Sequence, residues 1–434
     1  MGKSLVRKML EQLGAYTIDA DGLAHQVMAP GAPAYRPVIE TFGRWIVSPD
    51  GKIDRSKLGA VAFSHPEALA RLEALTHPIV GQGIDTLVSR AQQPIVVIEA
   101  IKLVDGQIGG WVDTIWVVDT APSVQVERLV KRGLPEADAH KRISMQNPQR
   151  DKLARANVTI SNSGTPQDTW VQVEREWKKI LEARGLKLRQ TDEVRTVKIS
   201  QPSAPPAAQP PRPQPVTPST TLSAAPTAPP SQPVIKPLTT TPTPAQPPAE
   251  PVHHPSTPVV TTVTPPTSET VSVSVKIRRG MPATADQIAQ LINQQTGKTL
   301  TRLDVMTSFG EKSYLLADMD NKIVGLAGFQ VENLITRMDE FIILPGTPQA
   351  ALAEALIGAV EQASKELQSE VGLMFVSNNA PPSISDVFNR MEYQKMELDT
   401  IKVPAWREAA EEAQPPNSML FAKKLRAERV LKPL

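Results

Sequence analysis

The first 21 residues, MGKSLVRKMLEQLGAYTIDAD (1–21), decide the fold that we predict for the first part of the chain. Residues 2–4 read Gly-Lys-Ser, the end of the phosphate-binding pattern G-x-x-x-x-G-K-[ST]. The first glycine of that pattern would stand before Met1, so the chain starts inside the loop. Apolar residues at 5, 6, 9, 10 and 13 have helical spacing and Gly14 follows them, which predicts a helix over 4–14.

A short strand over 16–21 is expected next, and it ends in the carboxylates of Asp19 and Asp21. Either aspartate could cap a helix that begins near Gly22. With Gly-Lys-Ser upstream, we favour a chemical role for Asp21 instead. A loop remnant, a helix and a strand tipped with aspartate are typical of the front half of a nucleotide kinase.

Composition sets the outer limits of the interpretation. The 434 residues predict two or three domains, and a net charge of +2 gives no electrostatic argument for a nucleic-acid partner. The absence of cysteine excludes disulfides and thiolate metal sites. Because no apolar run is long enough for a bilayer and no signal-peptide pattern opens the chain, we expect a cytoplasmic protein without a membrane partner.

The chain divides by composition into a domain over 1–190, a linker over 191–271 and a second domain over 272–434. The linker holds more than half of the 42 prolines, mixed with Ala, Thr, Ser and Gln. Such a segment cannot bury enough apolar surface to fold, so we predict a disordered tether rather than a docking site for proline-binding modules. Broad-specificity proteases should cut it and leave two folded fragments.

The first domain has the pattern of a parallel α/β sheet. Short apolar runs predict strands over 94–100, 114–119 and 157–160, with helices over 66–76, 122–132, 136–146 and 167–182. Strands that alternate with helices favour a parallel sheet covered by helices on both faces. Ligands bind such sheets beyond the carboxyl ends of the strands, where residues 2–4, Asp21 and the region of Glu99 are expected.

Phosphoryl transfer gives these residue types a chemical role. Lys3 would reach the β- and γ-phosphates of ATP, and the Ser4 hydroxyl would bind Mg²⁺. The backbone amides after Gly2 open a helix, whose N-terminus attracts phosphate. Asp21 would act as general base toward the acceptor hydroxyl, or as a metal partner.

Several motifs in order resemble the dephospho-coenzyme A kinases. Residues 18–25, IDADGLAH, resemble the acceptor-site motif of that family, and residues 51–59, GKIDRSKLG, resemble its G-x-I-D-R-x-x-L-G segment. Residues 69–78 resemble L-x-x-L-E-x-x-x-H-P, and residues 142–164 resemble its R-I-x-x-Q and A-D-x-x-I-x-N-x-G tail. The resemblance implies a P-loop kinase fold and ATP-dependent phosphorylation of the ribose 3′-hydroxyl of dephospho-CoA, the last step of coenzyme A synthesis.

The resemblance also implies roles for individual residues. Gly2, Lys3 and Ser4 would hold the phosphates and Mg²⁺, and Asn162 would lie near the adenine. Asp21 matches the proposed catalytic base of the family.

The resemblance also assigns three residues to the acceptor side of the site. His25, Arg55 and His77 fall in motifs that line the acceptor pocket. Arg132 lies in the segment that matches the mobile lid and would neutralise the transferring phosphate. The alternatives are a packed helix-end histidine for His77 and a solvated helix C-terminus for Arg132.

The sequence departs from the family at residues 99–105, where a proline is lost and Lys102 is gained, and at Asn157, which replaces an aspartate. The strand before the phosphate loop is also absent from the sequence. We favour a protein start upstream of Met1, while a catalytically inactive kinase-like domain remains the alternative. The motifs at 18–25 and 51–59 argue against a nucleoside monophosphate kinase.

The second domain is expected to be α/β and resembles the GNAT acyltransferases in the order of its elements. We predict a strand from 275 and a helix to 295, a hairpin turning at 320–321, a strand over 337–344, a helix over 349–367 and a strand over 372–376. The family's pyrophosphate loop, [RQ]-x-x-G-x-[GA], appears as LPGTPQAA (344–351), which lacks the glycine spacing and loses an amide at Pro348. We therefore expect a degenerate binding or packing module, with a CoA-like ligand left open, rather than an acetyltransferase.

Overall fold

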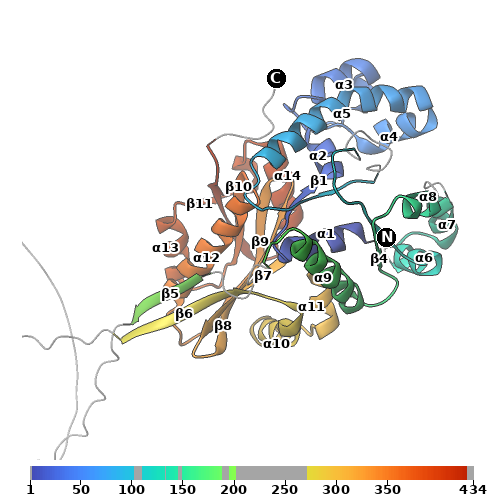
Figure 1. The fold of residues 1–434 in the computed structure, drawn as a ribbon. Helices are drawn as coiled ribbons and strands as arrows, with labels where there is room; N and C mark the ends of the chain where they lie inside the picture. Colours follow the sequence, from blue (N-terminus) through green and yellow to red (C-terminus); the bar gives the residue numbers. More distant parts are fainter. Residues whose placement is uncertain are drawn as a thin grey trace, which may run out of the picture. The chain divides into compact units, whose positions relative to one another are not determined.

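A computed structural model describes residues 2–101, 110–131, 133–144, 149–187, 195–201 and 271–427 (Figure 1). Within it, residues 1–201 and 272–434 form one compact unit. Most of the predicted linker, residues 202–270, lies outside the described residues.

The N-terminal half has the parallel strands that the sequence predicts. They are β1 (Tyr16–Asp19), β2 (Val96–Glu99), β3 (Trp116–Asp119) and β4 (Val158–Ser161). Their pairing differs from the single sheet that we expected. β1 pairs only with β2, and β3 only with β4, both in parallel, so the described strands form two separate two-stranded sheets. β2 and β3 therefore each have one edge without a described partner strand.

The helices predicted for the N-terminal half lie close to their expected positions, and further helices lie between them. They are α1 (Lys3–Gln12), α2 (Ala20–Gln26), α3 (Tyr35–Phe42), α4 (Arg55–Ser64), α5 (Pro66–Ser89), α6 (Pro122–Lys131), α7 (Glu136–Ser144), α8 (Gln149–Ala154) and α9 (Pro166–Ala183). The prediction for α5 was too short, because the helix continues past Pro78. Its later turns bury Val80, Ile84 and Leu87. That burial outweighs the hydrogen bond that a proline removes from a helix.

The amphipathic pattern of α1 has a visible cause in the core. Val6, Met9 and Leu10 are buried together with Trp170 and Trp177 of α9. The apolar spacing that predicted α1 therefore marks the face that packs on α9. This packing holds the start of α1, where Gly2 to Ser4 lie.

The C-terminal half is built on an eight-stranded sheet with the order β11-β12-β10-β9-β8-β7-β6-β5. Its strands are β5 (Arg195–Gln201), β6 (Val271–Arg279), β7 (Ser313–Met319), β8 (Lys322–Glu332), β9 (Ile335–Ile343), β10 (Val371–Ser377), β11 (Gln394–Met396) and β12 (Ser418–Lys424). β5 lies inside the span that composition predicted as linker. Its sequence, RTVKISQ, alternates apolar and polar residues, which suits a strand.

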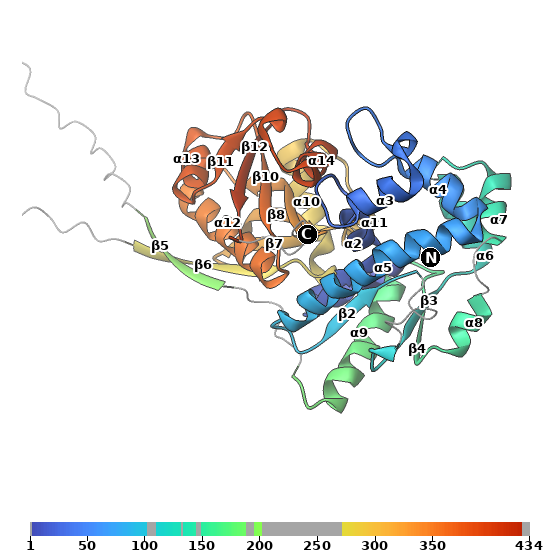
Figure 2. The same ribbon diagram turned by 90° about the horizontal axis from the view of Figure 1, so that it is seen from above.

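The helices of this half are α10 (Ala285–Thr296), α11 (Arg302–Ser308), α12 (Gln349–Glu366), α13 (Pro382–Arg390) and α14 (Pro404–Ala413). Alternation along β10 separates the two faces of the sheet. Met374 and Val376 are buried with α12, while Leu373 and Phe375 are buried with Ala410 of α14. The helices α12 and α14 thus cover opposite faces (Figure 2).

Two tight turns join the central strands of this sheet. The predicted turn at Asp320 and Asn321 is confirmed, with φ of 52° and 61°. The turn between β8 and β9 consists of Asn333 and Leu334, with φ of 51° and 64°. Positive φ at both central residues is the geometry that two-residue hairpins require.

Candidate active site

Gly2 begins α1 and lies against a buried asparagine. Its φ of 96° is in the left-handed region, and a Cβ built on Gly2 would overlap Nδ2 of Asn162. Asn162 is 2% exposed and accepts a hydrogen bond of 2.9 Å from Oγ1 of Thr169. The fold therefore brings together two residues that the sequence assigned to nucleotide binding, and only glycine suits the first position.

Glu99, at the carboxyl end of β2, connects the first turns of α1. Its Oε1 accepts from Oγ of Ser4 and its Oε2 from Nε of Arg7, each at 2.8 Å. Burial opposes the charge of Arg7, but the carboxylates of Glu11 and Glu99 outweigh it and raise the pKa of Arg7. Arg7 was not among the predicted site residues. A signal was present, because Arg7 stands four residues after Lys3 on the same face of a helix.

Asp21 lies in the first turn of α2 rather than at the end of a strand, because β1 ends at Asp19. The capping role belongs to Asp19, whose Oδ1 accepts from the amide of Gly22 at 2.9 Å. Asp21 is left free for another task, and its Oδ2 accepts from the amide of Ile101 at 3.1 Å. Burial and the charge of Asp19 raise the pKa of Asp21, while Lys3 opposes that shift.

The predicted acceptor residues are brought together only in part. Burial, and then the nearby guanidinium of Arg55, lower the pKa of His25, so His25 and Arg55 share one region. His77 is exposed on α5, and among the described residues no hydrogen bond or ion pair joins it to that region. Arg132 lies outside the described residues.

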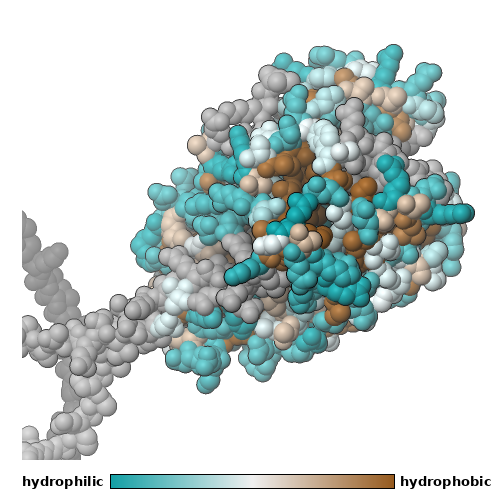
Figure 3. Space-filling view, in the orientation of Figure 1, coloured by the Kyte–Doolittle hydropathy of each residue, from teal (hydrophilic) through white to brown (hydrophobic). Residues whose placement is uncertain are grey.

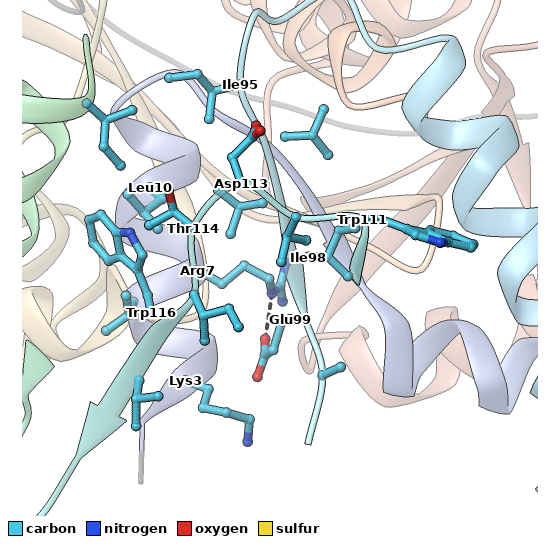
Figure 4. A pocket seen from close by; sticks show the side chains of 18 of the residues that line it. Lys3, Arg7, Leu10, Ile95, Ile98, Glu99, Trp111, Asp113, Thr114 and Trp116 are labelled. Carbon is cyan, nitrogen blue, oxygen red and sulfur yellow. Dashed lines mark hydrogen bonds and ion pairs between the residues drawn. The ribbon is translucent and has the colours of Figure 1, made fainter. Parts of the chain in front are cut away.

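A cavity of about 920 Å³ lies between β2 and β3, on the edges that lack a partner strand. Lys3, Arg7 and Glu99 line it together with apolar side chains from α1, β2, β3 and α9, namely Val6, Leu10, Val97, Trp116, Val118 and Trp177. Figure 4 shows Lys3 and Glu99 on the same side of the cavity, with Arg7 directed toward Glu99. Hydrophobic residues gather in a hollow of this face (Figure 3). All four residues of β2 are only partly buried, because they face this space.

The loop before α12 uses some of its backbone amides internally. The amide of Gln349 donates to the carbonyl of Thr347 at 2.7 Å, and that of Ala351 donates to the carbonyl of Pro348 at 3.1 Å. Pro348 has no amide hydrogen to offer. Two amides of the loop are thus engaged within it, and a third donor is missing at Pro348.

In the described part of the chain, none of the helices is both long and apolar enough to cross a membrane. The same residues contain no group of three or more His, Cys, Asp or Glu side chains placed to hold a metal ion.

Comparison with known proteins places the N-terminal half in a family. The family model described as dephospho-CoA kinase matches residues 1–168. The dephospho-CoA kinase of Geobacter sulfurreducens is 39% identical over 182 residues, which cover 41% of this chain and 92% of the relative.

Solved structures resemble each half. TT1252 from Thermus thermophilus is 29% identical, with a TM-score of 0.37, and the match covers 42% of this chain and 91% of that one. A putative acetyltransferase of Salmonella typhimurium, solved with its cofactor acetyl-CoA, is 10% identical with a TM-score of 0.29. That match covers 36% of this chain and 98% of the acetyltransferase.

Proposed function

Because this chain belongs to the dephospho-CoA kinase family, we propose that it transfers the γ-phosphoryl group of ATP to the ribose 3′-hydroxyl of dephospho-CoA. The observation that carries the proposal is that a lysine at the start of α1 and an aspartate of α2 lie near each other. Lys3 and Ser4 open α1, and Asp21 stands close enough for the charge of Lys3 to influence its pKa. A phosphate-binding cation and a proton acceptor beside each other are what phosphoryl transfer requires.

The residues divide the work of the reaction between them. Lys3 and the first amides of α1 bind and neutralise the phosphates of ATP. Asp21 accepts the proton of the 3′-hydroxyl as that oxygen attacks the γ-phosphorus, and the bond from phosphorus to the ADP oxygen breaks. The raised pKa of Asp21 brings the carboxylate closer to the range in which a general base is effective.

The donor set next to α1 suits Mg²⁺. The Ser4 hydroxyl and the Glu99 carboxylate lie 2.8 Å apart, and both are hard oxygen donors of the kind that Mg²⁺ prefers. When bound there with ATP, the ion supplies charge neutralisation. Ser4 and Glu99 are the residues that we propose to hold it.

The remaining assignments follow the same proposal. Asn162 lies against Gly2 and is proposed for the adenine side of the nucleotide site. His25, Arg55 and His77 are proposed for the acceptor pocket, with Arg132 as a lid residue. His25 and Arg55 have the stronger support, because the charge of Arg55 lowers the pKa of His25. A cytoplasmic location is part of this proposal.

The test is a coupled assay of ADP release with dephospho-CoA, ATP and Mg²⁺. Lys3→Ala should lower kcat/KM by about 10²–10³-fold, the effect of removing one preorganised donor. Lys178→Ala is a suitable control, because Lys178 is an exposed lysine on α9 that pairs with Glu174. Equal rates for the Lys3 and Lys178 variants would contradict the proposal. Absence of turnover in the unmodified chain would favour the inactive kinase-like alternative.

A weaker second function is supported by the sheet of the C-terminal half. β9 and β10 pair in parallel from Ile335 to Met338, and their register ends there although both strands continue. The end of this pairing is where we propose that a CoA-like ligand binds. Calorimetric titration of the full chain with acetyl-CoA tests this binding. A thiol-release assay with common amines should show no acetyl transfer, because in the loop at 344–351 Pro348 lacks an amide hydrogen and the amides of Gln349 and Ala351 already bond within the loop.

A further inference from the structure

Leu334 occupies a backbone position that disfavours its side chain. It is the second residue of the two-residue turn between β8 and β9, and the flanking Glu332 and Ile335 pair directly. Its φ is 64°, and glycine is the preferred residue at such positions. A leucine held in the left-handed region therefore suggests that its side chain has a task.

The side chain of Leu334 is buried in the core of the other half. Leu334 is 8% exposed and belongs to the same buried cluster as Tyr16, Ile18, Leu23 and Leu87. Tyr16 and Ile18 belong to β1, and Leu23 belongs to α2. The turn thus inserts an apolar side chain beneath the elements that carry Asp19, Asp21 and His25.

Buried charges extend this contact to α1. Nζ of Lys8 donates to the carbonyl of Val331 and to Oε1 of Glu11, each at 3.0 Å. Oε2 of Glu11 accepts from Oγ1 of Thr17 at 2.6 Å. Lys8 and Glu11 are only 2% and 5% exposed, so both depend on these partners for their hydrogen bonds. The end of β8 therefore fixes one face of α1.

Side-chain amides complete the contact from both directions. Gln26 of α2 donates to the carbonyl of Asn333, and Gln12 of α1 donates to the carbonyl of Phe309 at 3.3 Å. Gln368 donates in the other direction, to the carbonyl of Leu87 at 2.8 Å. In each bond a side chain of one half donates to a backbone carbonyl of the other half. These bonds therefore form only when the two halves are placed in one particular way.

We propose that the β8–β9 turn is a positioning element for the candidate active site, with Leu334 as its key residue. The turn contacts α2, which carries Asp21, and the adjoining end of β8 contacts α1, which carries Lys3 and Ser4. The C-terminal half then contributes to the kinase site without touching a substrate. The kinetic part of this inference rests on the proposed function, while the structural part does not.

The central experiment is Leu334→Gly in the full chain. For an isolated turn, glycine relieves the strain at positive φ and should stabilise the hairpin. For a positioning element, the same change should lower the melting temperature and speed amide hydrogen exchange in α1, β1 and α2. Asn321→Gly is the matched control, because Asn321 holds the same position in the exposed β7–β8 turn. This variant should leave hydrogen exchange in α1, β1 and α2 unchanged. Leu334→Met, which keeps the volume, should behave as the unchanged chain.

The outcomes separate this inference from the kinase assignment. Exchange is measured without substrate, so it decides the structural part even if no variant shows kinase activity. Where activity is present, Leu334→Gly should lower kcat on the order of tenfold, with Leu334→Met restoring it, because small displacements of catalytic groups are costly. Should Leu334→Gly fail to fold, Leu334→Ala is measured in its place. A higher melting temperature with unchanged exchange in α1, β1 and α2 would overturn the proposal.

Discussion

Asn162 occupies the space in which a side chain on Gly2 would have to lie. The two residues are far apart in sequence, and the pairing of β4 with β3 brings them together at the start of α1. The backbone amide of Asn162 donates to the carbonyl of Asp119 at 2.7 Å, and its side-chain oxygen accepts from Thr169. These two bonds hold Asn162 in place. The loop at Gly2 is thus shaped from outside as well as by its own sequence.

We predict that Gly2→Ala is costly for two separable reasons. An alanine at φ 96° is strained by roughly 1–2 kcal/mol, and its Cβ would in addition displace Asn162. Gly31→Ala is the matched control, since Gly31 has φ 78° and nothing lies near its Cβ position. Chemical denaturation should show a larger loss of stability for the Gly2 variant, and only that variant should lose nucleotide affinity. Equal losses would mean that Asn162 moves aside without cost.

Asp21→Asn should have opposite effects on stability and on activity. Burial and Asp19 raise the pKa of Asp21, so the folded state holds the proton more tightly than the unfolded chain does. The stability that this group contributes is complete below the ordinary pKa of an aspartate, and it is lost as pH rises through the raised pKa. At neutral pH the asparagine variant should therefore melt at a higher temperature, while at low pH the difference should vanish. Its kcat should fall by about 10²–10⁴-fold, the usual size of general-base assistance.

Melting curves between about pH 3 and pH 8 test the stability part of this prediction. Asp138→Asn, at an exposed position on α7, controls for the loss of one negative charge. Full activity of Asp21→Asn would remove Asp21 from the mechanism. A melting temperature that falls at neutral pH would show that the ionised carboxylate is stabilised by its hydrogen bond to Ile101.

Local patterns in the sequence predicted the helices and strands around the candidate site well. Gly2, Lys3 and Ser4 do open a helix, and the strands and most of the predicted helices of the N-terminal half lie within a few residues of their predicted bounds. Asp21 was assigned to the wrong element, because Asp19 takes the cap and ends the strand earlier. Periodicity cannot tell which of two nearby aspartates bonds to a backbone amide.

The burial of several residues depends on contacts between distant parts of the chain, and that burial had no local signal. Arg7 and Glu11 are polar residues on the face of α1 opposite to its apolar stripe, a pattern that normally indicates solvent. They are buried because other parts of the chain cover that face. Leu334 is a single leucine after an asparagine, and nothing in its neighbourhood indicates that it enters the core of another half. β5 was missed because its few residues precede a long proline-rich segment.

Cutting the linker should not separate the halves. Proteinase K should cleave within residues 202–270, whose composition cannot support a core. The sequence alone suggested two free fragments, but the buried contacts of Leu334, Lys8 and Gln368 should keep the fragments associated. They should elute together in size exclusion at neutral pH. Leu334→Asp is the control, because a buried unpaired charge at this contact should release them. Two separate peaks from the unchanged chain would refute this prediction.

The cavity between β2 and β3 should accept an additional strand. An extension before Met1 that encodes an apolar strand and a glycine-containing loop should enter this space and pair with both free strand edges. Burying four or five aliphatic side chains at roughly 1.5–3 kcal/mol each should raise the melting temperature strongly. Because Trp116 and Trp177 line the cavity, their fluorescence should shift to shorter wavelength when the strand excludes water.

The same extension should raise ATP affinity and turnover, because it supplies the loop amides that precede Gly2. A control extension with proline at alternate strand positions keeps the length and apolar character but removes backbone donors. It should give neither the stability nor the fluorescence shift. Equal behaviour of the two extensions would show that the strand edges of β2 and β3 are not the binding surface. An unchanged melting temperature with the first extension would show that the cavity does not accept a strand.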